Sequence, residues 1–204
     1  MRVCRFAEGG NTQLGFFSDQ SVIPLATAVA AHAESTGEPV DLETGCLLSL
    51  LGPDGQYHAA ATQLARWLDG DGSGHADALK RDLADVQLLV PLPRPNKLFL
   101  LAGNYAKHIE EGGGIAAERA ETFPYVFMKP PTTTLTNPGE AIRIPSVNPH
   151  STDYELELAV VIGRGGKGIS EADALGHVAG YTVINDISDR KFHPNPDRKQ
   201  RDKD

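Results

Sequence analysis

Residues 153–163 form an apolar stretch that carries two glutamates one residue apart, Glu155 and Glu157. Side chains of a strand alternate between the two faces of a sheet, so both carboxylates are predicted to point the same way. Ala159 and Val161 continue that face, which is therefore only partly polar. The opposite face receives four branched apolar side chains: Leu156, Leu158, Val160 and Ile162.

A third carboxylate, Asp186, interrupts the next β-prone run, residues 181–188. Asp is unfavourable within strands, and three carboxylates in one partly buried place would repel one another. A hard divalent cation removes this cost and prefers oxygen ligands. Glu155, Glu157 and Asp186 are therefore the predicted metal ligands. The alternative is a half-exposed strand with solvated acids, which is the commoner context of a Glu-x-Glu pattern taken alone.

The composition excludes several classes of function. The 204-residue chain has 40% hydrophobic residues, enough for a sizeable core, and a formal net charge of −8. This charge opposes general binding to nucleic acids or anionic membranes. Cys4 and Cys46 provide no metal spacing or disulfide framework, so we expect two reduced thiols. The N-terminus lacks the apolar region of a signal peptide, and no apolar run is long enough to cross a bilayer, so we expect a cytoplasmic protein.

Three prolines within residues 91–95 form an extended connector. It divides the chain into two predicted domains, a small N-terminal domain at residues 1–92 and a catalytic domain at residues 93–204. The first domain has an α/β pattern and no residue set that indicates chemistry, so a structural or interface role is expected. Its predicted strands are residues 2–6, 14–17 and 21–24, and its predicted helices are residues 26–33, 60–68 and 76–83.

Short strands outnumber helices in the second domain. Further strands are predicted at residues 99–102, 125–128 and 142–144, and a helix is predicted to begin at Ser170 with a capping-box-like pattern. This pattern favours a β-rich fold over a doubly wound one, so the expected fold class is α+β.

His108 and Glu111 are three residues apart on a predicted helical turn, which places them on one face. A neighbouring carboxylate orients an imidazole and raises its basicity, as in a general base. Three glycines, residues 112–114, end the segment and allow it to hinge as a lid over a substrate. A surface His–Glu pair is the alternative.

Lys129 ends an apolar strand and precedes two prolines that stiffen the chain. A lysine held there is suited to bind a carboxylate or a developing enolate. The alternative is a solvent-exposed lysine at the end of a strand.

Residues 163–168 match the dinucleotide-binding pattern G-x-G-x-x-G, and Asp186 follows at the spacing of its acidic residue. However, the next helix starts with its own cap at Ser170, and the preceding strand carries two glutamates. A central parallel strand is instead apolar on both faces. We interpret the glycines as a hairpin-like loop, which disfavours NAD(P) binding.

Together these segments resemble the fumarylacetoacetate hydrolase family over residues 97–204. Four motifs occur in the family's order: residues 104–111 resemble its Asn-Tyr-x-x-His-x-x-Glu lid, residues 126–130 its Phe-x-Lys-Pro strand, residues 153–163 its metal strand, and residues 180–188 the strand of its third ligand. The resemblance implies a mixed β-roll catalytic domain of the fumarylacetoacetate hydrolase type, often behind a small N-terminal domain.

The resemblance also implies a function. Members are commonly dimeric, metal-dependent enzymes, so we expect a homodimeric hydrolase that cleaves a C–C bond in a β-diketo or 2-oxo acid, such as a fumarylacetoacetate- or acylpyruvate-like substrate. The metal, Mg²⁺ or alternatively Mn²⁺ or Ca²⁺, would stabilise the enolate that leaves. A decarboxylase, lyase or isomerase of a 2-oxo acid on the same scaffold is the alternative.

The resemblance assigns roles to five further residues. His108, oriented by Glu111, would deprotonate the attacking water. Lys129 would bind substrate oxygens, with Arg190 and Tyr105 as further substrate-binding residues.

Two departures from the family pattern bear on these expectations. Many members have Gln seven residues after the third ligand, where this chain has His193, and the chain ends at Asp204, where the family continues with a lysine-containing segment and more strands. We therefore expect a truncated, N-terminal portion that self-associates or unfolds in isolation and has little hydrolase activity. A non-catalytic homologue or a metal-binding interaction module is the alternative.

Overall fold

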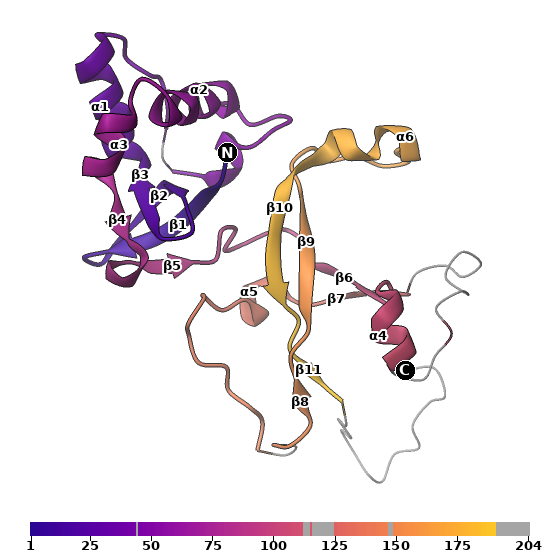
Figure 1. The fold of residues 1–204 in the computed structure, drawn as a ribbon. Coiled ribbons are helices and arrows are strands. Elements are labelled where there is room, and N and C mark those ends of the chain that lie inside the picture. The colour runs from indigo at the N-terminus through magenta and orange to yellow at the C-terminus, as the bar shows by residue number, and fades with distance from the viewer. Residues whose placement is uncertain (44, 112–114, 116–124, 147–148, 191–204) are drawn as a thin grey trace.

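The computed structural model describes residues 1–43, 45–111, 115, 125–146 and 149–190. An antiparallel sheet with helices packed on it forms the first part, and a set of two-stranded ladders forms the second (Figure 1). In the described ranges, no helix is both long enough and apolar enough to span a bilayer.

The first part contains a five-stranded antiparallel sheet with the order β4-β3-β2-β1-β5. Gly9 and Gly10, between β1 and β2, have φ values of 56° and 84°, as a tight hairpin turn of this kind requires. The predicted strands of this part are confirmed. The strands are β1 (Val3–Glu8), β2 (Asn11–Phe17), β3 (Ser21–Pro24), β4 (Arg81–Asp82) and β5 (Gln87–Leu89).

Three helices cover this sheet and enclose a hydrophobic core: α1 (Leu25–Thr36), α2 (His58–Asp69) and α3 (Ser73–Leu79). Leu25, Leu50 and Leu64 are fully buried in that core. Short 3-10 helices, η1 (Leu47–Leu50) and η2 (Leu83–Asp85), complete this part. Because it has a core of its own, the small N-terminal domain of residues 1–92 stays our prediction of the domain organisation.

The predicted helix at residues 76–83 is wrong beyond Leu79. Arg81 pairs with Val22 of β3, and its Nε lies 3.2 Å from a carboxylate oxygen of Glu8. Tertiary pairing with the edge of the sheet therefore ends the helix early, although the local sequence favours its continuation.

The second part is built from three antiparallel pairs of strands. They are β6 (Phe99–Ala102) with β7 (Tyr125–Met128), β9 (Leu156–Ile162) with β10 (Val178–Asn185), and β8 (Thr152–Asp153) with β11 (Ser188–Asp189). Short helices lie between them: α4 (Ala106–Glu111), α5 (Pro131–Thr134), α6 (Glu171–Ala174) and the 3-10 helix η4 (Leu175–His177). The predicted strand at residues 142–144 does not form, because in the described part of the chain these residues pair with no strand.

The loop between β9 and β10 confirms the hairpin interpretation of the glycine-rich segment. A dinucleotide site needs a second parallel strand after the helix, whereas β10 runs antiparallel to β9. Ser170 caps α6 as predicted, since its Oγ accepts a hydrogen bond from the Asp173 N–H at 3.3 Å.

The loop between β9 and β10 also contacts the first part of the chain. The Arg164 guanidinium binds both carboxylate oxygens of Asp54, with an Nε–Oδ2 distance of 2.8 Å, and this contact lowers the pKa of Asp54. Gly163 permits the close approach, because a Cβ there would lie 2.7 Å from the Cβ of Ala179 and 3.1 Å from the Gly52 carbonyl oxygen.

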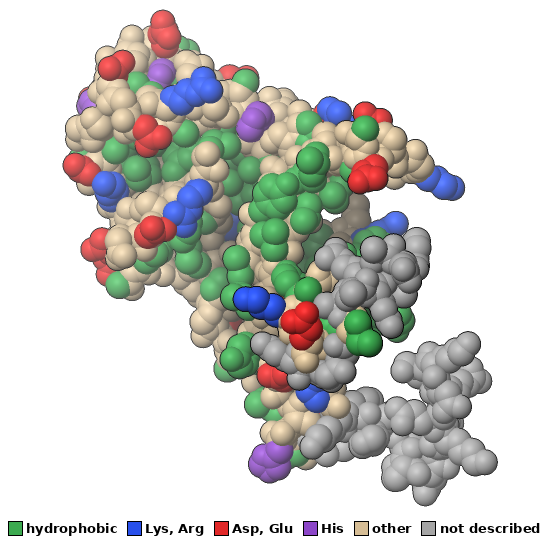
Figure 2. Space-filling model, turned by 45° about the vertical axis from the view of Figure 1, so that its right-hand side comes forward, with side chains coloured by type: hydrophobic (Ala, Val, Ile, Leu, Met, Phe, Trp, Pro, Cys, Tyr) green, Lys and Arg blue, Asp and Glu red, His purple; other side chains and the backbone are tan. Residues whose placement is uncertain are grey.

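The β9–β10 pair exposes its apolar face. Six hydrophobic side chains on this face are between 49% and 74% exposed: Leu156, Leu158, Val160, Ile162, Tyr181 and Val183. Figure 2 shows hydrophobic side chains gathered in the middle of the visible surface. An exposed apolar patch of this kind marks an interface or a site of aggregation.

We therefore predict that the polypeptide of residues 1–204 self-associates when it is purified alone. Replacing Leu158 and Val183 by Lys should shift the mass measured by light scattering towards the monomer, because charge opposes burial of the face. Leu48→Lys, at an exposed apolar site in the first part, is the matched control. A monodisperse, cooperatively melting monomer would contradict this prediction.

The two cysteines provide a second prediction. Burial raises the pKa of the Cys4 thiol to about 11, whereas Cys46 is exposed and both are free. At pH 8 a thiol reagent should label only Cys46 in the folded protein and both cysteines in denaturant, because the thiolate is the reactive form. Above pH ~8.5 the Cys4 thiol ionises in the unfolded chain but stays neutral in the folded protein. The free energy of unfolding should therefore fall as the pH rises from about 8.5 towards 11.

The control is Cys46→Ser, which should abolish rapid labelling of the folded protein. Rapid labelling of that variant at pH 8 without denaturant would show that Cys4 is accessible.

Candidate metal centre

The two ladders β9–β10 and β8–β11 share a single antiparallel register. Leu156 faces Asn185 at the end of one ladder, and Asp153 faces Ser188 at the start of the other. The gap between the ladders holds two residues of each strand: Tyr154 and Glu155, and Asp186 and Ile187. The predicted strand at residues 153–163 is thus divided in two, with its pairing partner unchanged.

Glu155 and Asp186 lie opposite one another in this gap. The Asp186 N–H donates a hydrogen bond to the Glu155 carbonyl oxygen at 2.8 Å. The Glu155 N–H is bound by the Asn185 side chain, whose Oδ1 lies 3.0 Å away. The backbone of Glu155 is therefore fixed on both sides, which sets the direction of its side chain.

The register places all three predicted ligands on one face. Glu157 faces Ile184 in the β9–β10 ladder, two residues from the Glu155–Asp186 pair on each strand. Because strand side chains alternate, the three carboxylates share a side. One oxygen from each of Glu155, Glu157 and Asp186 lies within 4.8 Å of the others. Asp186 is buried, with 4% of its surface exposed, and both glutamates are half-buried.

Two cations lie against these carboxylates. Lys129, directly after β7, forms an ion pair with Asp186, and its Nζ donates to the Ile187 carbonyl oxygen at 2.9 Å. Arg190 forms an ion pair with Glu155, and its Nε lies 3.2 Å from Asp153 Oδ2. Lys129 thus contacts the cluster and is only 28% exposed, whereas the alternative interpretation was a solvent-exposed lysine at the end of a strand.

The residues fit a hard divalent cation. The donor set consists of carboxylate oxygens alone, which suits Mg²⁺, Mn²⁺ or Ca²⁺. Two ligands at ~2.0–2.6 Å from one ion lie at most about 5 Å apart, so oxygens within 4.8 Å of one another are spaced as such a site requires.

Helix α4 approaches this region through Tyr105. The Tyr105 hydroxyl accepts a hydrogen bond from the Leu158 N–H at 3.1 Å, so the residue before α4 contacts β9. The predicted helical turn that carries His108 and Glu111 is present. The side chains of both residues, and the glycines at 112–114, lie outside the described residues.

Asp153 and Asn185 are two neighbours of the site that sequence reasoning missed. Asp153 precedes Glu155 by two residues on the same face, and it binds Arg190. Asn185 directly precedes Asp186 and binds the Glu155 backbone. The signal for Asp153 was present in the sequence, because the alternation that joins Glu155 to Glu157 extends back to it.

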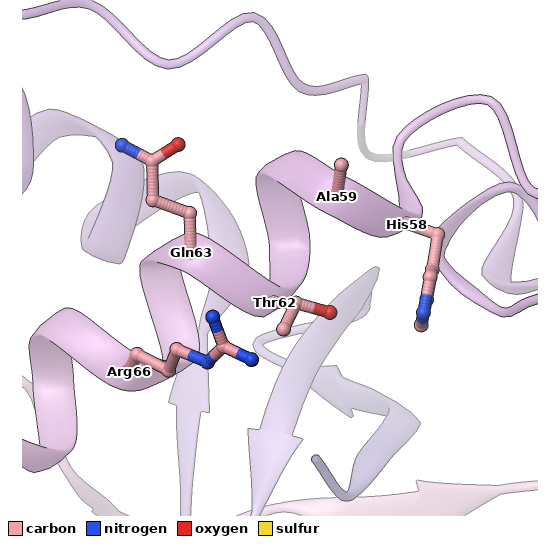
Figure 3. Close-up of a pocket in the computed structure, with 5 residues that line it drawn as sticks. All are labelled: His58, Ala59, Thr62, Gln63 and Arg66. Carbon is pink, nitrogen blue, oxygen red and sulfur yellow. The ribbon is translucent and has the colours of Figure 1, made fainter.

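A separate open pocket of about 450 Å³ lies along α2, and none of the three carboxylates lines it. His58, Thr62 and Arg66 point to one side of the helix in Figure 3. His58 Nδ1 lies 3.0 Å from the Leu50 carbonyl oxygen, which gives this imidazole a structural partner.

Comparison with known proteins then decides the family. Residues 97–203 match the family model described as "Fumarylacetoacetate (FAA) hydrolase C-terminal", and residues 1–49 match "Rv2993c-like, N-terminal". The chain belongs to the fumarylacetoacetate hydrolase family. The resemblance inferred from four motifs is confirmed, and so is the α+β fold class.

Two curated members of the family are similar over most of the chain. The oxaloacetate tautomerase YisK of Bacillus subtilis (strain 168) is 37% identical over 153 residues, 74% of this chain and 50% of that protein. The caffeoylpyruvate hydrolase of Neonothopanus nambi is 38% identical over 173 residues, 80% of this chain and 56% of that protein. This chain thus spans about half the length of these relatives.

The fold is also that of solved family structures. The maleylpyruvate hydrolase from Sphingobium sp. SYK-6, solved in complex with manganese(II) and pyruvate, aligns with a TM-score of 0.59 at 23% identity. The alignment covers 93% of this chain and 60% of that one. In the described residues, the strands around the carboxylates pair antiparallel, so the complete mixed β-roll stays a prediction.

The carboxylate cluster leads to a prediction about metal binding. Asp186→Asn and Glu157→Gln should each weaken Mn²⁺ binding, measured by titration calorimetry, by more than the ~10–100-fold typical of losing an outer-sphere partner. Each variant loses an anionic ligand but keeps its side-chain shape.

Asp77→Asn is the control, because Asp77, on α3, forms an exposed ion pair with Lys80, the residue directly after the helix. Equal Mn²⁺ affinity in Asp186→Asn and Asp77→Asn would show that Asp186 is no ligand. Melting curves in chelator establish that each variant is folded.

Proposed function

We propose that this protein is a divalent-metal-dependent hydrolase that cleaves a C–C bond in a 2-oxo or β-diketo acid. The observation that carries the proposal is the convergence of Glu155, Glu157 and Asp186 on one face, within 4.8 Å, in a member of the fumarylacetoacetate hydrolase family. Mg²⁺ is the proposed ion.

The names of the relatives support the substrate class. Oxaloacetate and caffeoylpyruvate, in the names of two relatives, both contain a 2-oxo acid. Its carboxylate and 2-oxo oxygens are adjacent, so together they chelate a hard cation well.

The roles proposed for the site follow from charge and position. When bound, the divalent ion would supply Lewis acidity next to the substrate oxygens. Lys129, whose ammonium already lies at Asp186, would bind the substrate carboxylate and keep it beside the ligands. Tyr105, with its hydroxyl on the edge of β9, would contact the distal part of the substrate. Arg190, on the carboxylate face, would contribute a further donor to the substrate.

His108 is the proposed general base and Glu111 the residue that orients it. The imidazole would take a proton from the water that attacks the remote carbonyl. The C–C bond then breaks, its electron pair stays with the 2-oxo acid fragment, and that fragment finally accepts a proton. The mobile lid formed by α4 and the glycines that follow it belongs to this proposal.

A tautomerase is the second candidate, because the relative from Bacillus subtilis is named an oxaloacetate tautomerase. This reaction moves a proton between carbon and oxygen and needs no attacking water. The same base and the same ligands would serve it, so the choice depends on which substrate is turned over. We also propose that the protein is a homodimer and that it acts in the cytoplasm.

Assays of the protein, and of any longer form that its gene specifies, with acylpyruvates and oxaloacetate test the proposal. Turnover should disappear after exhaustive chelation and return with Mg²⁺ or Mn²⁺. His108→Ala should lower kcat by ~10²–10⁴, the usual contribution of a general base. His75→Ala, at an exposed imidazole on α3, serves as the control.

Unchanged turnover after removal of divalent metal would exclude the proposed mechanism. An unchanged kcat in His108→Ala would exclude the assignment of the base. Oxaloacetate tautomerisation without release of pyruvate from acylpyruvates would favour the second candidate.

A further inference from the structure

We propose that Asp153 is a positioning residue of the metal centre, which holds Arg190 so that its guanidinium fixes the carboxylate of Glu155. This inference rests on the proposed function, because it concerns the orientation of a predicted metal ligand. It gives a role to a side chain that neither the sequence motifs nor the family resemblance singled out.

The first support is the backbone around Arg190. The Arg190 N–H donates to the Ser151 carbonyl oxygen at 2.9 Å, directly after the β8–β11 ladder. Arg190 therefore lies opposite Ser151, on the same face as Asp153 and Glu155. Diagonal neighbours on paired strands are within reach of a long side chain, so Arg190 can extend along the row of acids.

The second support is the geometry of the side chains. Arg190 Nε lies 3.2 Å from Asp153 Oδ2, and Arg190 Nη2 forms the ion pair with Glu155. Asp153 is held in turn, because its Oδ1 accepts a hydrogen bond from the Tyr154 N–H at 2.9 Å. The guanidinium thus bridges two carboxylates through two different nitrogens, which restricts its rotation more than a single contact would.

The third support is that Glu155 has its backbone fixed but its carboxylate at the end of a flexible side chain. The hydrogen bonds to Asn185 and Asp186 hold the N–H and C=O of Glu155. They do not hold its carboxylate, which Arg190 contacts. Without Asp153, the guanidinium could turn towards other acids of the cluster. Asp153 therefore selects Glu155 as the partner of Arg190.

The ion pairs are partly exposed, so stability is a poor measure of their role. The side chains of Asp153 and Arg190 are 46% and 41% exposed, and exposed ion pairs contribute little to folding. Loss of an outer residue that orients a ligand instead weakens metal binding by ~10–100-fold. The expected effect is thus on the ion and not on the melting temperature.

The test is the dissociation constant for Mn²⁺, measured by titration calorimetry. Asp153→Ala should weaken binding about tenfold, whereas Asp77→Ala, which removes an acid of α3 from a surface ion pair, should leave it unchanged. Asp153→Asn keeps the acceptor for the Tyr154 N–H but loses the charge that holds Arg190. It should therefore also weaken binding, and it covers the case in which the alanine variant does not fold.

A double-mutant comparison separates positioning from general electrostatics. If Asp153 acts through Arg190, the pair Asp153→Ala with Arg190→Ala should bind Mn²⁺ no more weakly than Arg190→Ala alone. Additive losses would overturn the proposal, and so would an Asp153→Asn variant with unchanged affinity. In either case, Mn²⁺ binding by the unmodified protein would still support the proposed metal site, and only the positioning role of Asp153 would be excluded. Absence of Mn²⁺ binding by the unmodified protein would overturn both.

Discussion

The carboxylate cluster depends on the antiparallel register between residues 151–162 and 178–190. Backbone hydrogen bonds keep this register across the gap between the two ladders, from the Asp186 N–H to Glu155 and from the Arg190 N–H to Ser151. Because side chains alternate, this one register places the acids on one face of the strand pair and the branched apolar side chains on the other. The only irregularity in the β9–β10 ladder falls between Val178 and Gly180, at the end remote from the acids.

Two positively charged side chains, which follow different strands, form ion pairs with the acids of this face. Asp186 is almost completely buried, and a buried carboxylate is costly unless it is paired. Lys129 reaches it from the end of β7, while Arg190 reaches Glu155 from the residue directly after β11, on the same two chain segments that carry the acids. Lys129 therefore connects two separate pairs of strands through its ion pair with Asp186 and its hydrogen bond to the Ile187 carbonyl oxygen. A divalent ion bound here would lie among carboxylates that already attract positive charge.

The sequence predicted those features that depend on local pattern. The alternation around Glu155 and Glu157, and the position of Asp186 within a β-prone run, were sufficient to propose the cluster. Features that depend on residues far apart in the sequence were either missed or predicted wrongly. The bond from Asn185 to the Glu155 backbone can be inferred only once the register is known. The end of the helix at Leu79 likewise depends on the edge of a sheet formed some 60 residues earlier in the chain. The metal-ligand roles of the three acids stay predictions, and so do the roles that the family resemblance assigns to His108, Glu111, Lys129, Arg190 and Tyr105.

The shared register has a consequence for changes in chain length. Deletion of Leu156, which lies between Glu155 and Glu157, would move every side chain on one flank of the deletion to the other face of the strand pair. It would separate Glu157 from Glu155 even though all three acids remained in the sequence. A deletion in the loop that joins β9 to β10 would leave both strands paired as before. The number of residues between the acids is thus as much a determinant of the site as their identity, and variation in length should be confined to the loops.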